Sequence, residues 1–265
     1  MSNRKNRYSQ IIEAVFFKYY RPGLDELAFA RSDIAEAAER LGVAVPKNLG
    51  DVLYSFRYRA NLPASVAQKA PAGHEWVIRP AGRARYKFAL AAASRVVPSA
   101  MLAQTKIPDA TPGVIEKYVL NDEQALLAKV RYNRLVDIFT SLACYSLQSH
   151  VRTSVPGLGQ VETDEVYVGI DTRGAHYVLP VQAKGTSDTI GVVQIEQDLA
   201  VCATKFPDLI CRPLAAQFLS NDVIALFEFE STEDGVAVVA EKHYTLVRPE
   251  ELSPEELERY RRRPD

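Results

Sequence analysis

Four polar side chains near the middle of the chain are spaced so that they could meet at one site. One residue separates Glu162 from Asp164, and one residue separates Gln182 from Lys184. Successive side chains of a β-strand point to opposite faces, so each pair would share a face if its segment formed a strand. Two carboxylates, an amide oxygen and an ammonium group at one spot could hold a hard divalent cation and place the lysine beside the water bound to it. The expected chemistry is hydrolysis assisted by a divalent metal ion.

The segments that carry these residues have the composition of a β-hairpin. Residues 161–170 alternate in polarity and are rich in β-branched and aromatic side chains, which predicts a strand, and residues 177–184 predict a second one. The residues between them, Asp171-Thr172-Arg173-Gly174, are typical of a turn, because glycine can adopt a positive φ. The hairpin would bring Asp164 and Gln182, which lie 18 residues apart, close together.

Asp164 followed by Gln182-Ala183-Lys184 resembles the motif of the PD-(D/E)xK nuclease superfamily, which has the restriction-endonuclease-like fold. In that superfamily an acidic residue on one strand is followed by (D/E)-x-K on the next strand. The chain departs from the motif at Gln182, because glutamine offers a carbonyl oxygen and no negative charge. Some members of the superfamily carry Q-x-K, and Glu162 could supply the missing charge from the face of Asp164.

The resemblance implies an α/β fold with a core of helix, mixed β-sheet and helix, and the activity of a Mg²⁺-dependent DNA endonuclease. Asp164, Gln182 and Glu162 would bind Mg²⁺, with Mn²⁺ as a substitute, and Lys184 would orient or deprotonate the attacking water. The substrate would be double-stranded DNA, and a homodimer is expected because cutting both strands needs two sites. A site-specific type II restriction enzyme is the first interpretation. A DNA-binding regulator with a degenerate nuclease core and a structure-selective nuclease of repair or recombination stay open as alternatives.

Two helices should flank the hairpin. Asn121 or Asp122 could cap a long helix over 121–150, with Glu123 in its first turn. In many members of the superfamily a glutamate on this helix joins the catalytic site, but Glu123 could instead only complement the helix dipole. The second helix is predicted after the hairpin, and it carries Gln194, which resembles a glutamine in several branches of the superfamily; the alternative is an exposed helical side chain. The remaining predicted elements are this second helix over 190–206, strands over 209–217, 221–230 and 235–247, and a last helix with a capping box at Ser253.

The charge distribution divides the chain into two modules. Residues 1–100 contain 16 Lys and Arg against 8 Asp and Glu, whereas residues 101–265 contain 16 against 25. A basic first module is a candidate for contact with phosphates, and a solvated basic surface is the alternative. We predict a DNA-binding domain over 1–95, a proline-containing linker over 96–118 and a catalytic domain over 119–265.

The first module resembles a winged-helix domain in the order of its predicted elements, three helices followed by a β-hairpin. The helices are expected over 8–20, over 32–41 with Ser32 as the N-cap, and over 46–58, and the short strands over 74–78 and 83–88. In such a domain the third helix reads DNA, and the alternative is that the arginines of this helix and of the hairpin pair with local carboxylates or simply solvate the fold. Trp76 and Phe56 are expected in the core. The residues expected to contact DNA are Arg57, Arg59 and Asn61 at the end of the third helix, Arg79, Arg83, Arg85 and Lys87 in the hairpin, and Gln194 beside the catalytic residues.

The composition of the 265 residues is typical of a globular protein, with 47% hydrophobic and 25% charged residues. No apolar segment is long enough to span a bilayer, so no membrane partner is expected. The three cysteines are far apart and odd in number, which favours a reducing, cytoplasmic setting. The four histidines lack the spacing of a zinc site.

Overall fold

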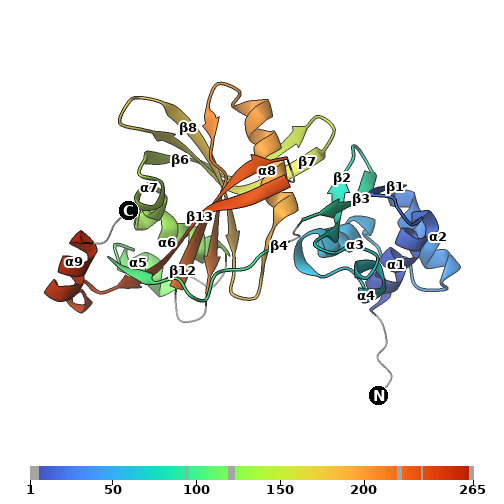
Figure 1. The fold of residues 1–265 in the computed structure, drawn as a ribbon, viewed down its shortest axis with the longest axis horizontal. Coiled ribbons are helices and arrows are strands. Elements are labelled where there is room, and N and C mark those ends of the chain that lie inside the picture. Colours follow the sequence, from blue (N-terminus) through green and yellow to red (C-terminus); the bar gives the residue numbers. More distant parts are fainter. Residues whose placement is uncertain (1–5, 93–94, 119–122, 220–222, 234, 263–265) are drawn as a thin grey trace, which may run out of the picture.

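A computed structural model describes residues 6–92, 95–118, 123–219, 223–233 and 235–262. The fold is of the α/β class, as predicted: a mixed β-sheet flanked by helices forms the larger part, and a smaller part with its own three-stranded sheet precedes it (Figure 1). The N-terminal part, blue and cyan in Figure 1, lies at one end of the molecule, and α9 lies at the other. Within the described ranges, no helix is long and apolar enough to cross a membrane.

The N-terminal part packs its helices against an antiparallel sheet of order β1-β3-β2. Phe16 of α1 packs edge-to-face on Trp76 and Phe88, at ring-centroid distances of 5.3 and 5.1 Å. The expected core positions of Trp76 and Phe56 are confirmed, since both are buried. The first two predicted helices and the hairpin are present, and β1 is an additional strand that pairs with β3. The elements are α1 (Arg7–Tyr19), β1 (Glu26–Ala30), α2 (Arg31–Arg40), α3 (Leu49–Tyr54), η1 (Ser55–Arg59), α4 (Ala64–Ala67), β2 (Glu75–Pro80) and β3 (Arg85–Ala91).

Asp33, and not the predicted Ser32, supplies the side chain that caps α2. Its carboxylate accepts the backbone N–H of Ala30 at 2.7 Å, and it also binds the ammonium of Lys18 at 2.5 Å and the hydroxyl of Tyr19 at 2.7 Å. Burial acts to raise the pKa of the Asp33 carboxyl, but the three hydrogen bonds outweigh it, so this pKa lies below its ordinary range. The ionised carboxylate therefore ties α1 to the start of α2.

The third helix is shorter than predicted and changes its winding. It begins at α3, where the side chain of Asn48 accepts the N–H of Gly50 at 3.0 Å. It then widens into η1, a π-helical turn closed by a hydrogen bond of 2.7 Å from the N–H of Ala60 to the carbonyl of Ser55. Such turns are rare and occur frequently at functional sites.

The segment predicted as a linker, 96–118, contributes strands to the sheets. β4 (Arg95–Val96) pairs with β9 (Ile190–Gly191), and β5 (Gln104–Pro108) pairs in parallel with β13 (Gly235–Val247). The prolines of this segment made a linker the expected structure. Pro108 is nevertheless compatible with a strand, because it lies at the end of an edge strand, where its missing N–H removes no hydrogen bond that the ladder needs. α5 (Gly113–Tyr118) completes this segment.

The large sheet has the strand order β5-β13-β12-β11-β8-β7-β6, and β10 also pairs with β8. The predicted hairpin is present: β7 and β8 are antiparallel, with a register from Ile170 opposite His176 to Glu165 opposite Val181. The later predicted strands and helices are present as well. The elements are α6 (Glu123–Tyr132), α7 (Leu135–Thr140), β6 (Ala143–Val155), β7 (Gly159–Ile170), β8 (His176–Lys184), α8 (Val192–Lys205), β10 (Ile210–Cys211), β11 (Leu214–Phe218), β12 (Val223–Thr232), η2 (Pro249–Glu251) and α9 (Pro254–Arg261).

The single long helix predicted over 121–150 is wrong. The helix is interrupted at Arg134, whose φ of 50° is left-handed, and after α7 the chain forms the strand β6. β6 is the edge strand of the sheet, and most of its side chains are exposed, so it has no alternation of apolar residues that would mark it as a strand. The predicted caps, Asn121 and Asp122, lie outside the described residues.

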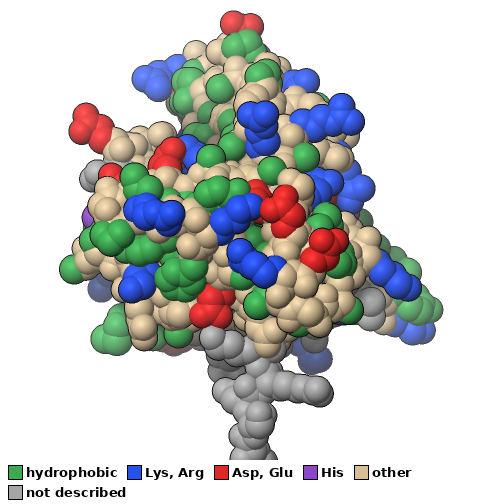
Figure 2. Space-filling model, turned by 90° about the vertical axis from the view of Figure 1, so that its right-hand side faces the viewer, with side chains coloured by type: hydrophobic (Ala, Val, Ile, Leu, Met, Phe, Trp, Pro, Cys, Tyr) green, Lys and Arg blue, Asp and Glu red, His purple; other side chains and the backbone are tan. Residues whose placement is uncertain are grey.

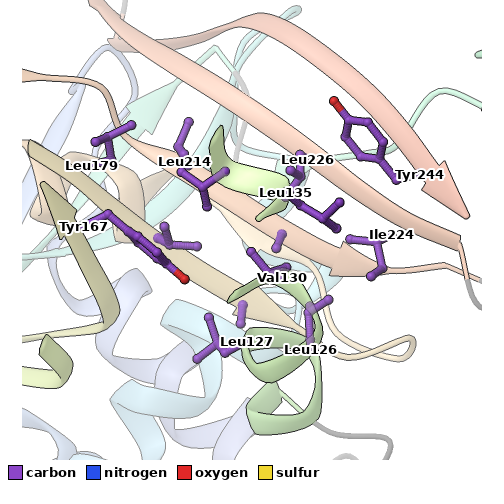
Figure 3. Packing of buried hydrophobic residues seen from close by; sticks show 14 of the residues in the cluster. Leu126, Leu127, Val130, Leu135, Tyr167, Leu179, Leu214, Ile224, Leu226 and Tyr244 are labelled. Carbon is purple, nitrogen blue, oxygen red and sulfur yellow. The ribbon is translucent and has the colours of Figure 1, made fainter. Parts of the chain in front are cut away.

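Helices α6 and α7 cover one face of the large sheet, and α8 covers the other. On the α8 face, Ile195 packs against Ala215 and Phe227. Each large side chain buried in these layers contributes about 2 kcal/mol, so the two faces together hold β7 and β8 firmly in place. Figure 3 shows the α6 face, where the labelled side chains are Leu126, Leu127, Val130, Leu135, Tyr167, Leu179, Leu214, Ile224, Leu226 and Tyr244.

Candidate active site

A pocket of about 1230 Å³ lies where the hairpin, the start of α6 and the N-terminal part meet. The larger part contributes the predicted residues Glu162, Asp164, Gln182 and Lys184 to its lining, together with Glu123. The N-terminal part contributes η1 and the neighbouring end of α3. The pocket is therefore built by both parts of the chain.

The ends of β7 and β8 place Asp164 and Lys184 in the same pocket. The ladder between the strands ends at Glu165 opposite Val181, and beyond it the N–H of Ala183 donates to the Asp164 carboxylate at 2.8 Å. Lys184 is 7% exposed, although it carries a charge. A buried ammonium requires anions nearby, and the lining of the pocket supplies them.

The ammonium of Lys184 does not fully compensate the negative charges of the carboxylates around it. The ammonium lies 3.6 Å from the carboxylate of Glu123. Burial raises the pKa of Asp164, and the neighbouring ammonium of Lys184 only partly opposes this. Burial also raises the pKa of Glu123, with Lys184 again opposing it and the charges of Asp164 and Asp188 adding to it. A further cation in the pocket would favour the ionised form of both acids.

Glu162 lies at the rim of the pocket, where it is turned toward β6. Its side chain is 42% exposed and accepts a hydrogen bond from Arg152 at 3.1 Å, and His150 lies 4.0 Å away. It lines the same pocket as Asp164, as the alternation along the strand predicted. Its carboxylate is therefore shared with basic groups of β6.

Gln182 belongs to a buried polar network with α8. Its Nε2 donates to both oxygens of Asp198, at 3.1 and 2.9 Å, and the hydroxyl of Thr163 donates to the same carboxylate at 2.6 Å. The amide of Gln194 donates to Oε1 of Gln182 at 3.3 Å. Burial raises the pKa of Asp198 to about 7, against the hydrogen bonds from Thr163 and Gln182. Asp198 was not predicted from the sequence, although it lies one helical turn after Gln194 and so on the same face of α8.

The donors that reach the pocket fit a hard cation. In the part of the chain that the structure describes, no three His, Cys, Asp or Glu side chains are gathered closely enough to form a metal-binding group. The carboxylates of Asp164 and Glu123 and the amide oxygen of Gln182 are nevertheless the oxygen donors that Mg²⁺ prefers, and Mg²⁺ usually keeps several waters beside one or two carboxylates.

Arg57 extends from η1 into the same pocket. Its Nε and Nη2 are buried and have no hydrogen-bond partner within the protein, and its guanidinium lies over the ring of Tyr58 at 4.7 Å. The hydroxyl of Tyr58 donates to Gln197 of α8 at 3.1 Å. Unpaired guanidinium nitrogens at the edge of a pocket are well suited to an anion.

The predicted third helix is therefore docked on the larger part. Arg79, which was expected to contact DNA, also faces this contact: its guanidinium grips the carboxylate of Glu196 with two hydrogen bonds, of 2.8 and 2.6 Å. Gln194 lines the pocket from α8. The alternative of pairing with a local carboxylate fits Arg79.

Four of the other residues expected to contact DNA, Asn61, Arg83, Arg85 and Lys87, do not line the pocket. Arg83 is exposed in the turn before β3, Arg85 is exposed at the first position of β3, and Lys87 is paired with Glu26 at 2.5 Å. Asn61 is exposed beyond η1. Arg59 lies in η1, and its side chain is not among those that the structure describes. Figure 2 shows the face of the N-terminal part, over which Lys and Arg side chains are spread with fewer Asp and Glu among them.

Comparisons of the chain with protein-family models, with curated proteins and with solved structures find no match.

Proposed function

We propose that the chain is a Mg²⁺-dependent DNA endonuclease with a restriction-endonuclease-like core. The observation that carries this proposal is the meeting of Asp164 and the buried Lys184 in one pocket, with Glu123 at 3.6 Å from the lysine. The order of helix, antiparallel hairpin and helix around them supports the same core. Glu123 would act in the site, the more specific of its two expected roles.

The pocket residues divide into those that hold a cation and those that meet the phosphate. Asp164 and Gln182 would hold Mg²⁺, as expected, together with Glu123 in place of the expected Glu162, whose carboxylate lies beside Arg152 and His150. The ion supplies Lewis acidity and lowers the pKa of a bound water. The ammonium of Lys184 orients the attacking water and stabilises the charge that develops on the phosphate oxygens. Arg57, which lines the pocket from η1, would add a guanidinium for contact with the phosphate. Mn²⁺ should substitute for Mg²⁺.

The N-terminal part would bind double-stranded DNA. Its element order places β1 between α1 and α2 and the β2–β3 hairpin after the remaining helical segments, and β1 pairs with β3; this arrangement supports a winged-helix-like fold. Arg83 and Arg85 are exposed at the tip of its hairpin and are free to reach phosphates. A homodimer would place two pockets on the two strands of the duplex, as a type II restriction enzyme requires.

A structure-selective nuclease is the second candidate, and one observation favours it. Tyr58 and Arg79 bind residues of α8, so the helix expected to read a major groove is occupied by an intramolecular contact. A protein docked in this way would recognise the shape of a branched duplex more readily than its sequence.

Incubation of the purified protein with plasmid DNA and with branched duplexes, in Mg²⁺ and in Mn²⁺, tests these proposals. Discrete plasmid fragments indicate a site-specific enzyme, and cutting confined to the branched substrates indicates the structure-selective one. Retained DNA binding without cleavage in either metal would overturn both and favour a regulator with a degenerate core.

A further inference from the structure

We propose that Asp198 is a positioning residue for Gln182, and that its presence is the reason why the chain carries glutamine at this position. Asp198 belongs to α8 and is completely buried, as is Thr163, which donates to it. The role of Gln182 as a metal ligand rests on the proposed function, whereas the pairing of Asp198 with an amide does not.

The contacts of Asp198 fix which end of the Gln182 amide faces it. Both carboxylate oxygens lie within hydrogen-bond distance of the same nitrogen, at 2.9 and 3.1 Å. The same nitrogen also lies 3.5 Å from the backbone carbonyl of Glu162, which can only accept a hydrogen bond, so the NH₂ group faces Asp198 and the carbonyl oxygen faces away from it. The ambiguity of an amide orientation is thereby removed.

The orientation leaves the carbonyl oxygen of Gln182 available to the pocket. A carbonyl oxygen has two lone pairs, and one of them is occupied by the amide of Gln194 at 3.3 Å. The other can serve a cation held by Asp164. Without Asp198 the amide could turn over and offer its NH₂ group, which repels a cation.

A glutamate at position 182 would clash electrostatically with Asp198. Its oxygens would replace the amide at a separation of about 3 Å, and two carboxylates at this distance cannot both ionise. Lys184, the nearest cation of β8, is already shared by Asp164 and Glu123. The motif usually has an acidic residue at the position of Gln182. In this chain the negative charge is instead on Asp198 of α8, which is hydrogen-bonded to Gln182.

A set of four proteins tests this inference at pH 8: the wild type, Gln182→Glu, Asp198→Asn and the double variant. Gln182→Glu alone should lower the Tm by about 5–10 °C, because it brings two buried carboxylates together. Asp198→Asn alone should weaken Mn²⁺ binding, measured by calorimetry, by about 10-fold to 100-fold, because asparagine accepts either orientation of the amide. The double variant should recover both the Tm and the affinity, because the introduced asparagine can donate its NH₂ group to the introduced carboxylate, which restores the pair with its two members exchanged.

The matched control is Gln182→Glu combined with Asp208→Asn, which removes one negative charge from an exposed position. The inference is overturned if this control recovers the Tm as well as the Asp198→Asn double variant does. If the wild type binds no Mn²⁺ but the Tm values follow the expected pattern, the pairing of Asp198 with Gln182 stands and the proposed metal-dependent function fails.

Discussion

Replacement of Lys184 by methionine isolates the contribution of one buried charge, because methionine keeps most of the length and apolar contact of the side chain. The side chain of Lys184 is 9% exposed, so water cannot take the place of the ammonium when it is removed. Loss of one positioned donor at developing negative charge typically slows an enzyme by about 10²-fold to 10³-fold, which corresponds to roughly 3–4 kcal/mol of transition-state stabilisation. We expect a cleavage rate that is lower by about this factor.

The assay is single-turnover cleavage of plasmid DNA at saturating protein, with DNA affinity measured separately in the absence of metal. The affinity should stay within about threefold of the wild type, because one phosphate contact accounts for little of a duplex interface. Lys205→Met, at an exposed lysine in the last turn of α8, is the control and should cut at the wild-type rate. A Lys184→Met variant that cuts as fast as this control would refute the assignment of the site.

Three further predictions concern the two parts of the chain and their contact. Arg57→Gln should slow single-turnover cleavage by about 10-fold or more, whereas the exposed Arg85→Gln should weaken DNA binding and leave the rate at saturation unchanged; the reverse pattern would exchange their roles. A double-mutant cycle of Arg79→Ala and Glu196→Ala in urea unfolding should give a coupling of about 1–2 kcal/mol, because their side chains are only 21% and 25% exposed, and a coupling near zero would argue against this contact between the parts. Asp33→Asn should destabilise the protein by about 2 kcal/mol at neutral pH. Because the folded pKa of Asp33 is lowered, its contribution is present above the unfolded pKa of about 4 and is lost as the pH falls through the folded pKa. A difference in Tm between wild type and variant that stayed constant down to acidic pH would contradict this prediction.

The hairpin could be predicted because both of its strands are rich in β-branched and aromatic residues and a short turn sequence joins them. From Tyr177 to Lys184 the strand is apolar with polar residues at its end, and the turn before it contains Gly174, whose φ is 84°. Signals of this kind lie in consecutive residues and can therefore be recognised in the sequence. Alternation predicted only that Asp164 shares a face with Glu162 and Lys184 with Gln182; that the two faces meet depends on the hairpin register and was expected from the resemblance to the nuclease motif.

The elements that the sequence did not predict lack such a local signal. β6 is exposed on both faces along most of its length, so its polar residues fit a surface helix as well as an edge strand. Asp198 looks like one more solvated charge on a helix, and only the position of α8 against Gln182 and Thr163 makes it a buried hydrogen-bond acceptor. Arg57 joins the pocket through the docking of the two parts, which no spacing within one segment encodes.

The connection between the two parts is fastened to the larger part at two points, by β4 on β9 and by β5 on β13. A connection that is paired with the sheets in this way limits the relative motion of the two parts, whereas a flexible linker would leave their separation variable. In an enzyme of the proposed kind, the reach from the grip on the duplex to the scissile bond is then built into the protein. The enzyme should accordingly cut the DNA at a constant distance from the site where the N-terminal part binds, whatever the sequence between the two positions.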